Sequence, residues 1–112
     1  MSSRQRFHLA IGVADIPTSV ADYSRRLACP PVLVIDGEYA LWRTPTLNFS
    51  IRKTAIETAG MVRHLGWEDD AATEFLSETD VNGILWERFS AEHQADEIRT
   101  LWPRTRYQAP EK

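Results

Sequence analysis

Three side chains of metal-binding type stand out in this sequence of 112 residues: His8, His64 and Glu87. Two imidazoles and one carboxylate form a ligand set that leaves coordination positions open for water or a substrate. Divalent iron, manganese, zinc or nickel would each accept these ligands, so the residue types do not select the metal. The sequence thus predicts a divalent-metal site with three protein ligands, in which Glu87 is also the candidate catalytic residue.

The neighbours of the two histidines favour a shared site. Because side chains alternate between the faces of a strand, His8 shares its face with Ala10 and Gly12, and His64 shares its face with Gly66. Such small residues would leave room for a ligand. A lone histidine or glutamate on a strand more often has a hydrogen-bonding or surface role. The prediction therefore depends on the three residues jointly.

Three further residues are predicted to bind the substrate. Asn48 and Ser50 are the polar residues of the strand that ends the first half of the chain. Phe89 shares a strand face with Glu87, two positions away. We expect these side chains to line the same site as the metal ligands.

The elements that must position these residues form two unequal halves. In the first half, period-two patterns predict strands, and an apolar stripe predicts a helix that Asp15 can cap. Turn signals at Asp36-Gly37 and Thr44-Pro45 separate the strands after that helix. The result is a βαβββ module over about residues 6–52, with strands predicted at 6–13, 31–35, 38–43 and 46–52.

The second half is an abbreviated copy, over about residues 61–101. Strands are predicted at 61–68, 73–78 and 83–90, and Asn82-Gly83 favours a tight turn before the last one. Ser90 can cap a final helix, which is followed by a tail at 104–112. We therefore expect one domain over residues 1–112, of class α+β. Paired βαβββ-type modules, the second one shortened, would form a curved mixed sheet with covering helices.

The two halves begin alike. Phe7-His8-Leu9-Ala10-Ile11 and Arg63-His64-Leu65-Gly66-Trp67 share the order histidine, leucine, small residue, bulky apolar residue. Four matching positions are a weak signal alone, but each copy opens a run that ends in a strand with polar residues. The repeat predicts that a local two-fold relation brings the two histidines together.

Charge and composition narrow the class of partner. A formal net charge of -3 opposes a broad phosphate-binding surface, so we expect no nucleic-acid partner. The apolar runs are far shorter than a membrane span, and the N-terminal residues hold no stretch of signal-peptide length. One cysteine, Cys29, cannot form an intramolecular disulfide. We expect a cytoplasmic protein without a membrane partner.

The opening residues resemble a known superfamily. The order His8-Leu9-Ala10-Ile11-Gly12-Val13-Ala14-Asp15, with Tyr23 on the helix that follows, is similar to the start of vicinal oxygen chelate proteins. These include glyoxalases, bleomycin-resistance proteins and extradiol dioxygenases. His64 matches the histidine that begins their second module, and their closing strand is matched by Asp80, Gly83 and Glu87. The resemblance covers about residues 7–89.

The resemblance implies a fold and a chemistry. Paired βαβββ modules would form a cup around a divalent metal, often in dimers, with His8, His64 and Glu87 as ligands. The metal commonly stabilises an enediolate or another vicinal oxygen pair by direct coordination. Glyoxalase-type members often have a fourth, carboxylate ligand on the strand where this sequence has Asn48, Ser50 and Arg52. That departure argues against glyoxalase I activity and favours dioxygenase or lyase chemistry.

Two functions follow from these observations. The leading hypothesis is a metal-dependent lyase or dioxygenase acting on a small oxygenated molecule. The alternative is a metal-free homodimer that binds or sequesters a small ligand, as bleomycin-resistance proteins do, and it is motivated by the short second module and four tryptophans. A purely structural subunit is a third possibility.

Overall fold

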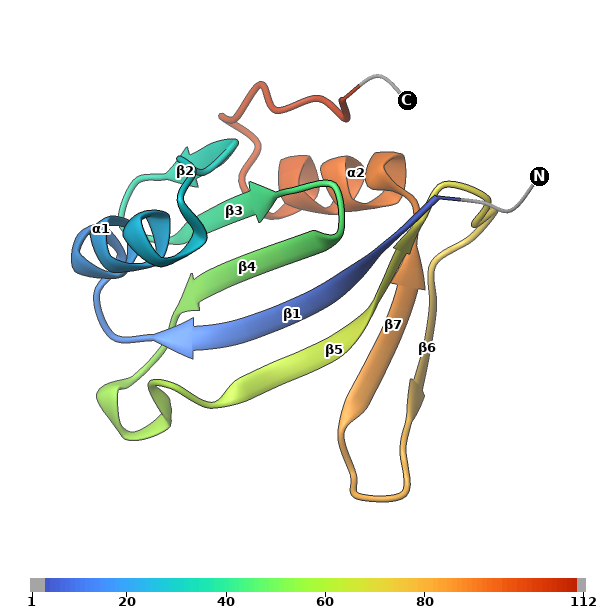
Figure 1. Ribbon diagram of the computed structural model, residues 1–112, viewed down its shortest axis with the longest axis horizontal. Helices are drawn as coiled ribbons and strands as arrows, with labels where there is room; N and C mark the ends of the chain where they lie inside the picture. The colour runs from blue at the N-terminus through green and yellow to red at the C-terminus, as the bar shows by residue number, and fades with distance from the viewer. Residues whose placement is uncertain (1–3, 111–112) are drawn as a thin grey trace.

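A computed structural model describes residues 4–110 and shows an α+β fold with one open, seven-stranded mixed sheet and two helices (Figure 1). The fold class predicted from the sequence is therefore confirmed. No helix in this part of the chain is long and apolar enough to cross a membrane. The tail predicted at 104–112 has no helix or strand over 104–110, and residues 111 and 112 lie outside the described part. In chain order the elements are β1 (Gln5–Val13), α1 (Ile16–Leu27), β2 (Leu33–Ile35), β3 (Tyr39–Arg43), β4 (Leu47–Lys53), the short 3-10 helix η1 (Ile56–Thr58), β5 (Val62–Asp69), β6 (Leu76–Thr79), β7 (Leu85–Phe89) and α2 (Ala91–Leu101).

The sheet contains two similar sets of strands, joined at its centre. Its strand order is β2-β3-β4-β1-β5-β7-β6. We call β1 to β4 with α1 module one, and β5 to β7 with α2 module two. In each module the first strand runs parallel to the closing strand, β4 or β7. The two first strands, β1 and β5, pair antiparallel, which gives the modules a local two-fold relation.

Helix α1 covers one face of module one. Asp15 caps the helix by accepting a hydrogen bond from the Thr18 backbone N–H, as the sequence predicts. The apolar stripe of α1 packs on a buried cluster from the sheet, and this cluster forms the larger part of the core. Its buried members are Val13, Ile16, Ala40, Trp42, Phe49 and Ile51.

Helix α2 packs on the opposite face of the sheet, directly after β7. Its N-terminus has a capping box in which Ser90 and His93 satisfy each other's backbone N–H groups. Ile98 packs with Tyr39 and Leu41 of β3, in a second core cluster that also contacts Tyr107 of the tail. This is the sheet face that carries His8, so α2 covers the side on which the metal ligands were predicted.

The pairing of β5 with β7 requires a glycine at position 66. Its φ of +156° and its close approach to β7 leave no space for a side chain: a Cβ at this position would lie 1.9 Å from the Glu87 carbonyl oxygen. The expectation that Gly66 makes room for a ligand was therefore wrong. The absence of a side chain at Gly66 lets β5 and β7 pair.

Candidate metal centre

Three adjacent strands bring His8, His64 and Glu87 together. The Nε2 atoms of the two histidines lie 2.9 Å apart, and His64 Nε2 lies 3.1 Å from Glu87 Oε1. One ligand atom from each residue lies within 4.8 Å of the others. Strand register explains this convergence, because Gly66 of β5 stands opposite His8 of β1 on one side and opposite Glu87 of β7 on the other. The predicted trio is thus one cluster in the structure.

Asn48 fixes the tautomer of His8. His8 Nδ1 lies 3.2 Å from the Asn48 backbone oxygen and 2.9 Å from Asn48 Oδ1. The orientation of the Asn48 amide follows from its contact with Glu68. The atom 2.8 Å from that carboxylate must be the donor Nδ2, so the amide atom that faces His8 is the oxygen. Both partners of Nδ1 are therefore acceptors, so Nδ1 carries the proton. The lone pair of His8 is then on Nε2, which faces His64.

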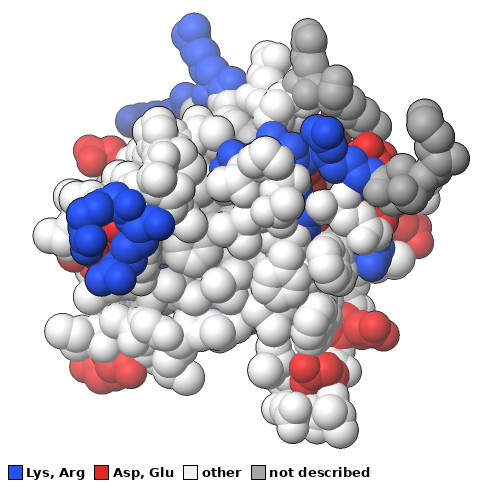
Figure 2. All heavy atoms as spheres, viewed as in Figure 1, with Lys and Arg blue, Asp and Glu red and all other residues white. Residues whose placement is uncertain are grey.

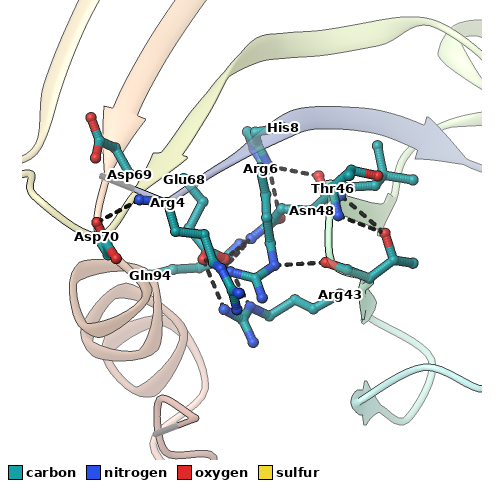
Figure 3. A network of polar contacts seen from close by, with 12 residues as sticks. Arg4, Arg6, His8, Arg43, Thr46, Asn48, Glu68, Asp69, Asp70 and Gln94 are labelled. Atoms are coloured by element: carbon teal, nitrogen blue, oxygen red, sulfur yellow. Dashed lines mark hydrogen bonds and ion pairs between the residues drawn. The ribbon is translucent and has the colours of Figure 1, made fainter. Parts of the chain in front are cut away.

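A buried polar network holds Asn48 in place (Figure 3). Asn48 Nδ2 also donates to Gln94 Oε1 of α2 at 2.8 Å, and Gln94 Nε2 donates back to Asn48 Oδ1 at 3.2 Å. Glu68 accepts two hydrogen bonds from Arg43, both 2.8 Å long, and one of 3.0 Å from Arg6. Burial would raise the pKa of Glu68, but its hydrogen bonds to Arg43 and Asn48 outweigh burial and hold that pKa below the usual value. The network thus supports His8 with an ionised carboxylate.

Sequence reasoning did not find the supporting residues Arg6, Arg43, Glu68 and Gln94. Glu68 lies two and four positions after Gly66 and His64, so the alternation of β5 places it on the face of His64. That period-two relation was the one available signal. Its partners come from other elements and have no local pattern.

Burial sets the protonation of the three candidate ligands. It lowers the pKa of His8, where hydrogen bonds to Asn48 oppose the shift only in part. Burial and the neighbouring His8 lower the pKa of His64 to about 3. Burial and the nearby Glu97 raise the pKa of Glu87 to about 7. The imidazoles are therefore neutral, which is the form that binds metals, and Glu87 can lose its proton near neutral pH.

A narrow cavity lies between the trio and α2. Its volume is about 30 Å³, and Ser50 and Phe89 are among the residues that line it. Phe89 packs edge-on against the His8 ring, with ring centroids 4.9 Å apart, and stacks on Phe75. A cavity of this size holds water-sized guests, so an organic substrate must bind across its mouth or displace side chains of α2.

The three predicted substrate-binding residues have different positions. Ser50 and Phe89 line the cavity. Asn48 is completely buried behind His8, and its amide is engaged by His8, Glu68 and Gln94. Asn48 is therefore placed to orient a ligand residue. Direct substrate contact by Ser50 and Phe89 remains a prediction.

The spacing of the histidines suits a metal. Metal–nitrogen bonds are about 2.1 Å long, so one ion could bind both nitrogens only if they lie within about 4.2 Å of each other. The observed 2.9 Å between the Nε2 atoms is within that limit. An imidazole whose other nitrogen donates to a carbonyl oxygen, as in His8, is also the usual arrangement of a ligating histidine. The donor set therefore fits a divalent ion.

Comparison with known proteins adds one structural likeness. No family model and no curated protein matches the sequence. A solved structure described as "The crystal structure of NAD-dependent benzaldehyde dehydrogenase from Legionella pneumophila" matches with a TM-score of 0.53 and 11% sequence identity. The match covers 75% of this chain and 97% of that chain. At such low identity the likeness concerns the fold alone.

Proposed function

We propose that this chain is a divalent-metal-dependent enzyme of the vicinal oxygen chelate type, acting on a small oxygenated molecule. The observation that carries the proposal is the convergence of three ligand atoms from three strands. The fixed Nδ1–H tautomer of His8 strengthens it, because an Nε2 lone pair is then available to an ion. His8, His64 and Glu87 are the ligands in this proposal, and iron, manganese, zinc and nickel are the candidate ions.

A divalent ion held here would act as a Lewis acid on a substrate oxygen. Residues of the chain form the environment in which the ion and substrate would meet. Phe89 and Ser50 form part of the cavity wall, and α2 restricts the access of water. The strand that would carry a fourth carboxylate ligand in a glyoxalase has Asn48, Ser50 and Arg52. Lyase or dioxygenase chemistry is accordingly the activity we propose, in the cytoplasm, where the single free cysteine would stay reduced.

Metal content tests this proposal directly. Protein purified without a metal-chelating tag would be loaded separately with each of the four ions and measured by elemental analysis. We expect about one ion per chain, and none in His64→Ala, because that variant loses a ligand. The matched control is His93→Gln, which removes the remaining histidine of the chain while keeping a residue that can complete the capping box. Wild-type protein without metal, or equal metal in His64→Ala, would exclude the site.

One observation favours the alternative, a metal-free homodimer that binds a small ligand. Within residues 4–110, no helix covers module two on the face where the Phe7 ring meets the rings of Trp67 and Trp86 edge to face. A groove of about 550 Å³ lies there, lined in part by Trp67, Trp86 and Leu76. Figure 2 shows that the surface across β1 and β5 is largely uncharged in this view, with charged side chains around its margin.

Sedimentation of the wild-type chain distinguishes the two functions, together with ligand binding by His64→Ala. A dimer that dissociates on Trp86→Glu, and whose ligand binding survives His64→Ala, would favour the metal-free alternative. A monomer whose ligand binding is lost in His64→Ala would favour the enzyme.

A further inference from the structure

Two arginines line the same cavity as the metal ligands. Arg52 lies on β4 and Arg63 on β5, next to His64. Neither guanidinium makes a hydrogen bond or ion pair with any residue between 4 and 110. The Arg52 guanidinium instead lies over the Trp102 ring, 5.4 Å from its centroid. Both groups therefore keep their hydrogen-bond donors free at the cavity.

The two positive charges are close enough to affect each other. Arg52 and Arg63 both line the narrow cavity. Like charges close to each other raise the free energy of the unliganded chain. A bound anion would relieve this repulsion, because it would interact favourably with both guanidiniums.

The proposed metal increases the need for an anion. Without an ion, two arginines and two glutamates, Glu87 and Glu97, carry the charges of the cavity lining. These charges balance when both carboxylates are ionised. A divalent ion between two neutral histidines and Glu87 would add two positive charges to that lining. A negatively charged substrate would then be attracted by the ion and by the arginines together.

We infer that the substrate of this site is a small carboxylate, whose carboxyl group is bound by Arg52 and Arg63 while the rest of the molecule faces the metal ligands. This inference rests on the proposed function and names its substrate class. The planar donor fork of a guanidinium matches the two oxygens of a carboxylate. The cavity of about 30 Å³ is too small to enclose such a molecule, so a small carboxylate would bind across its mouth or displace side chains of α2.

Lactate and lactamide form a suitable pair of probes, because they have nearly the same shape and differ in charge. Each would be titrated into zinc-loaded, ¹⁵N-labelled protein whose zinc content has first been measured, and binding would be followed by NMR. We expect lactate to bind at least about tenfold more tightly than lactamide, as charge-assisted hydrogen bonds imply. Arg52→Gln and Arg63→Gln should each weaken lactate binding by about tenfold while the zinc content stays unchanged.

Arg104→Gln is the control, because it makes the same change of charge on an exposed residue of the tail. It should leave lactate binding unchanged. Equal binding of lactate and lactamide would overturn the inference. So would unchanged lactate affinity in the Arg52 and Arg63 variants at full zinc content. If the wild-type chain binds no zinc, iron, manganese or nickel, the proposed function fails. In that case, lactate is titrated into the metal-free wild-type chain and the two arginine variants. This titration tests whether Arg52 and Arg63 bind a carboxylate without a metal.

Discussion

The two modules place a histidine at matching positions but support it in opposite ways. His8 of module one is 2% exposed, and its Nδ1 is bound by Asn48 of the closing strand β4. The His64 side chain is 14% exposed, and within residues 4–110 its polar contacts are Nε2 contacts to His8 and Glu87. In module one the closing strand β4 thus holds the histidine by its Nδ1. In module two the closing strand β7 instead supplies a further candidate ligand, Glu87, next to Nε2 of the histidine.

The same strand topology thus gives the two histidines different roles. The protein orients His8 before any ion is present, since its hydrogen bonds extend through Asn48 to the buried Glu68. His64 and Glu87 are held mainly by their strands and by each other. We expect that an ion would add more order to module two than to module one.

The largest effect is expected from Gly66→Ala, which breaks the pairing within module two. The new methyl group would collide with the backbone of Glu87, so the free energy of unfolding should fall by more than about 3 kcal/mol. Urea denaturation followed by tryptophan fluorescence measures this change. Gly37→Ala is the control, because Gly37 also has a positive φ of 72° but open space around it, and should cost about 1 kcal/mol. Similar losses in both variants would contradict the close approach of β5 and β7.

Asn48→Ala tests the support that distinguishes module one. It removes the side-chain partner of His8 Nδ1, but keeps the backbone oxygen 3.2 Å away and all three ligands, so metal affinity should fall by about 10- to 100-fold. The NMR shifts of the ring nitrogens should also show a smaller population of the Nδ1–H tautomer of His8. Asn82→Ala, in the exposed β6–β7 turn, should change neither measurement. An unchanged tautomer in Asn48→Ala would mean that the backbone oxygen of residue 48 is sufficient.

The pH dependence of metal affinity tests module two. The pKa of Glu87 is about 7, so below this value the ion must displace a proton from Glu87. Affinity should therefore rise by about tenfold per pH unit below pH 7 and level off above it. The pKa of His64, about 3, means that its proton does not compete near neutral pH, and the lowered pKa of His8 reduces competition from that imidazole. Competition with a chromophoric chelator on either side of pH 7 measures the slope, and an affinity independent of pH would refute Glu87 as a ligand.

The smallest effect is expected from Ser90→Ala, which weakens the cap of α2. Loss of the capping box should lower the free energy of unfolding by about 1 kcal/mol. Metal content should be unchanged, because Ser90 contacts none of the three ligands. Ser77→Ala on the exposed strand β6 provides the baseline for a serine substitution. Metal loss in Ser90→Ala would show that the position of α2 determines the site.

The sequence predicted most of the elements because their signals are local. Asp15 and Ser90 cap the two helices as expected. Gly83 has a φ of +82°, which fits the predicted turn. Element ends differ by a few residues, most clearly at β6, which begins at Leu76 although a strand was predicted from residue 73. The grouping of His8, His64 and Glu87 followed from the internal repeat, since the modules pair through their first strands.

The sequence did not predict features that depend on contacts between residues far apart in the chain. Asn48 was predicted to contact substrate, but it binds Glu68, 20 positions away, and Gln94, 46 positions away. No local pattern links residues so far apart in the chain. The position of α2 over the candidate site was also not foreseen. The apolar stripe around Ile98 shows that the helix must cover a surface, but it does not say which face of the sheet.

The buried position of Glu68 has a consequence for the effect of salt. Mobile ions screen exposed charges within a Debye length of about 8 Å at physiological ionic strength, but they screen buried pairs much less. Glu68 is 3% exposed, and its partners Arg6 and Arg43 are 14% and 11% exposed. Asp22 of α1, which pairs with two arginines more than 60% exposed, is accessible to salt. High ionic strength should thus weaken the surface pairs of α1 while the orientation of His8 persists.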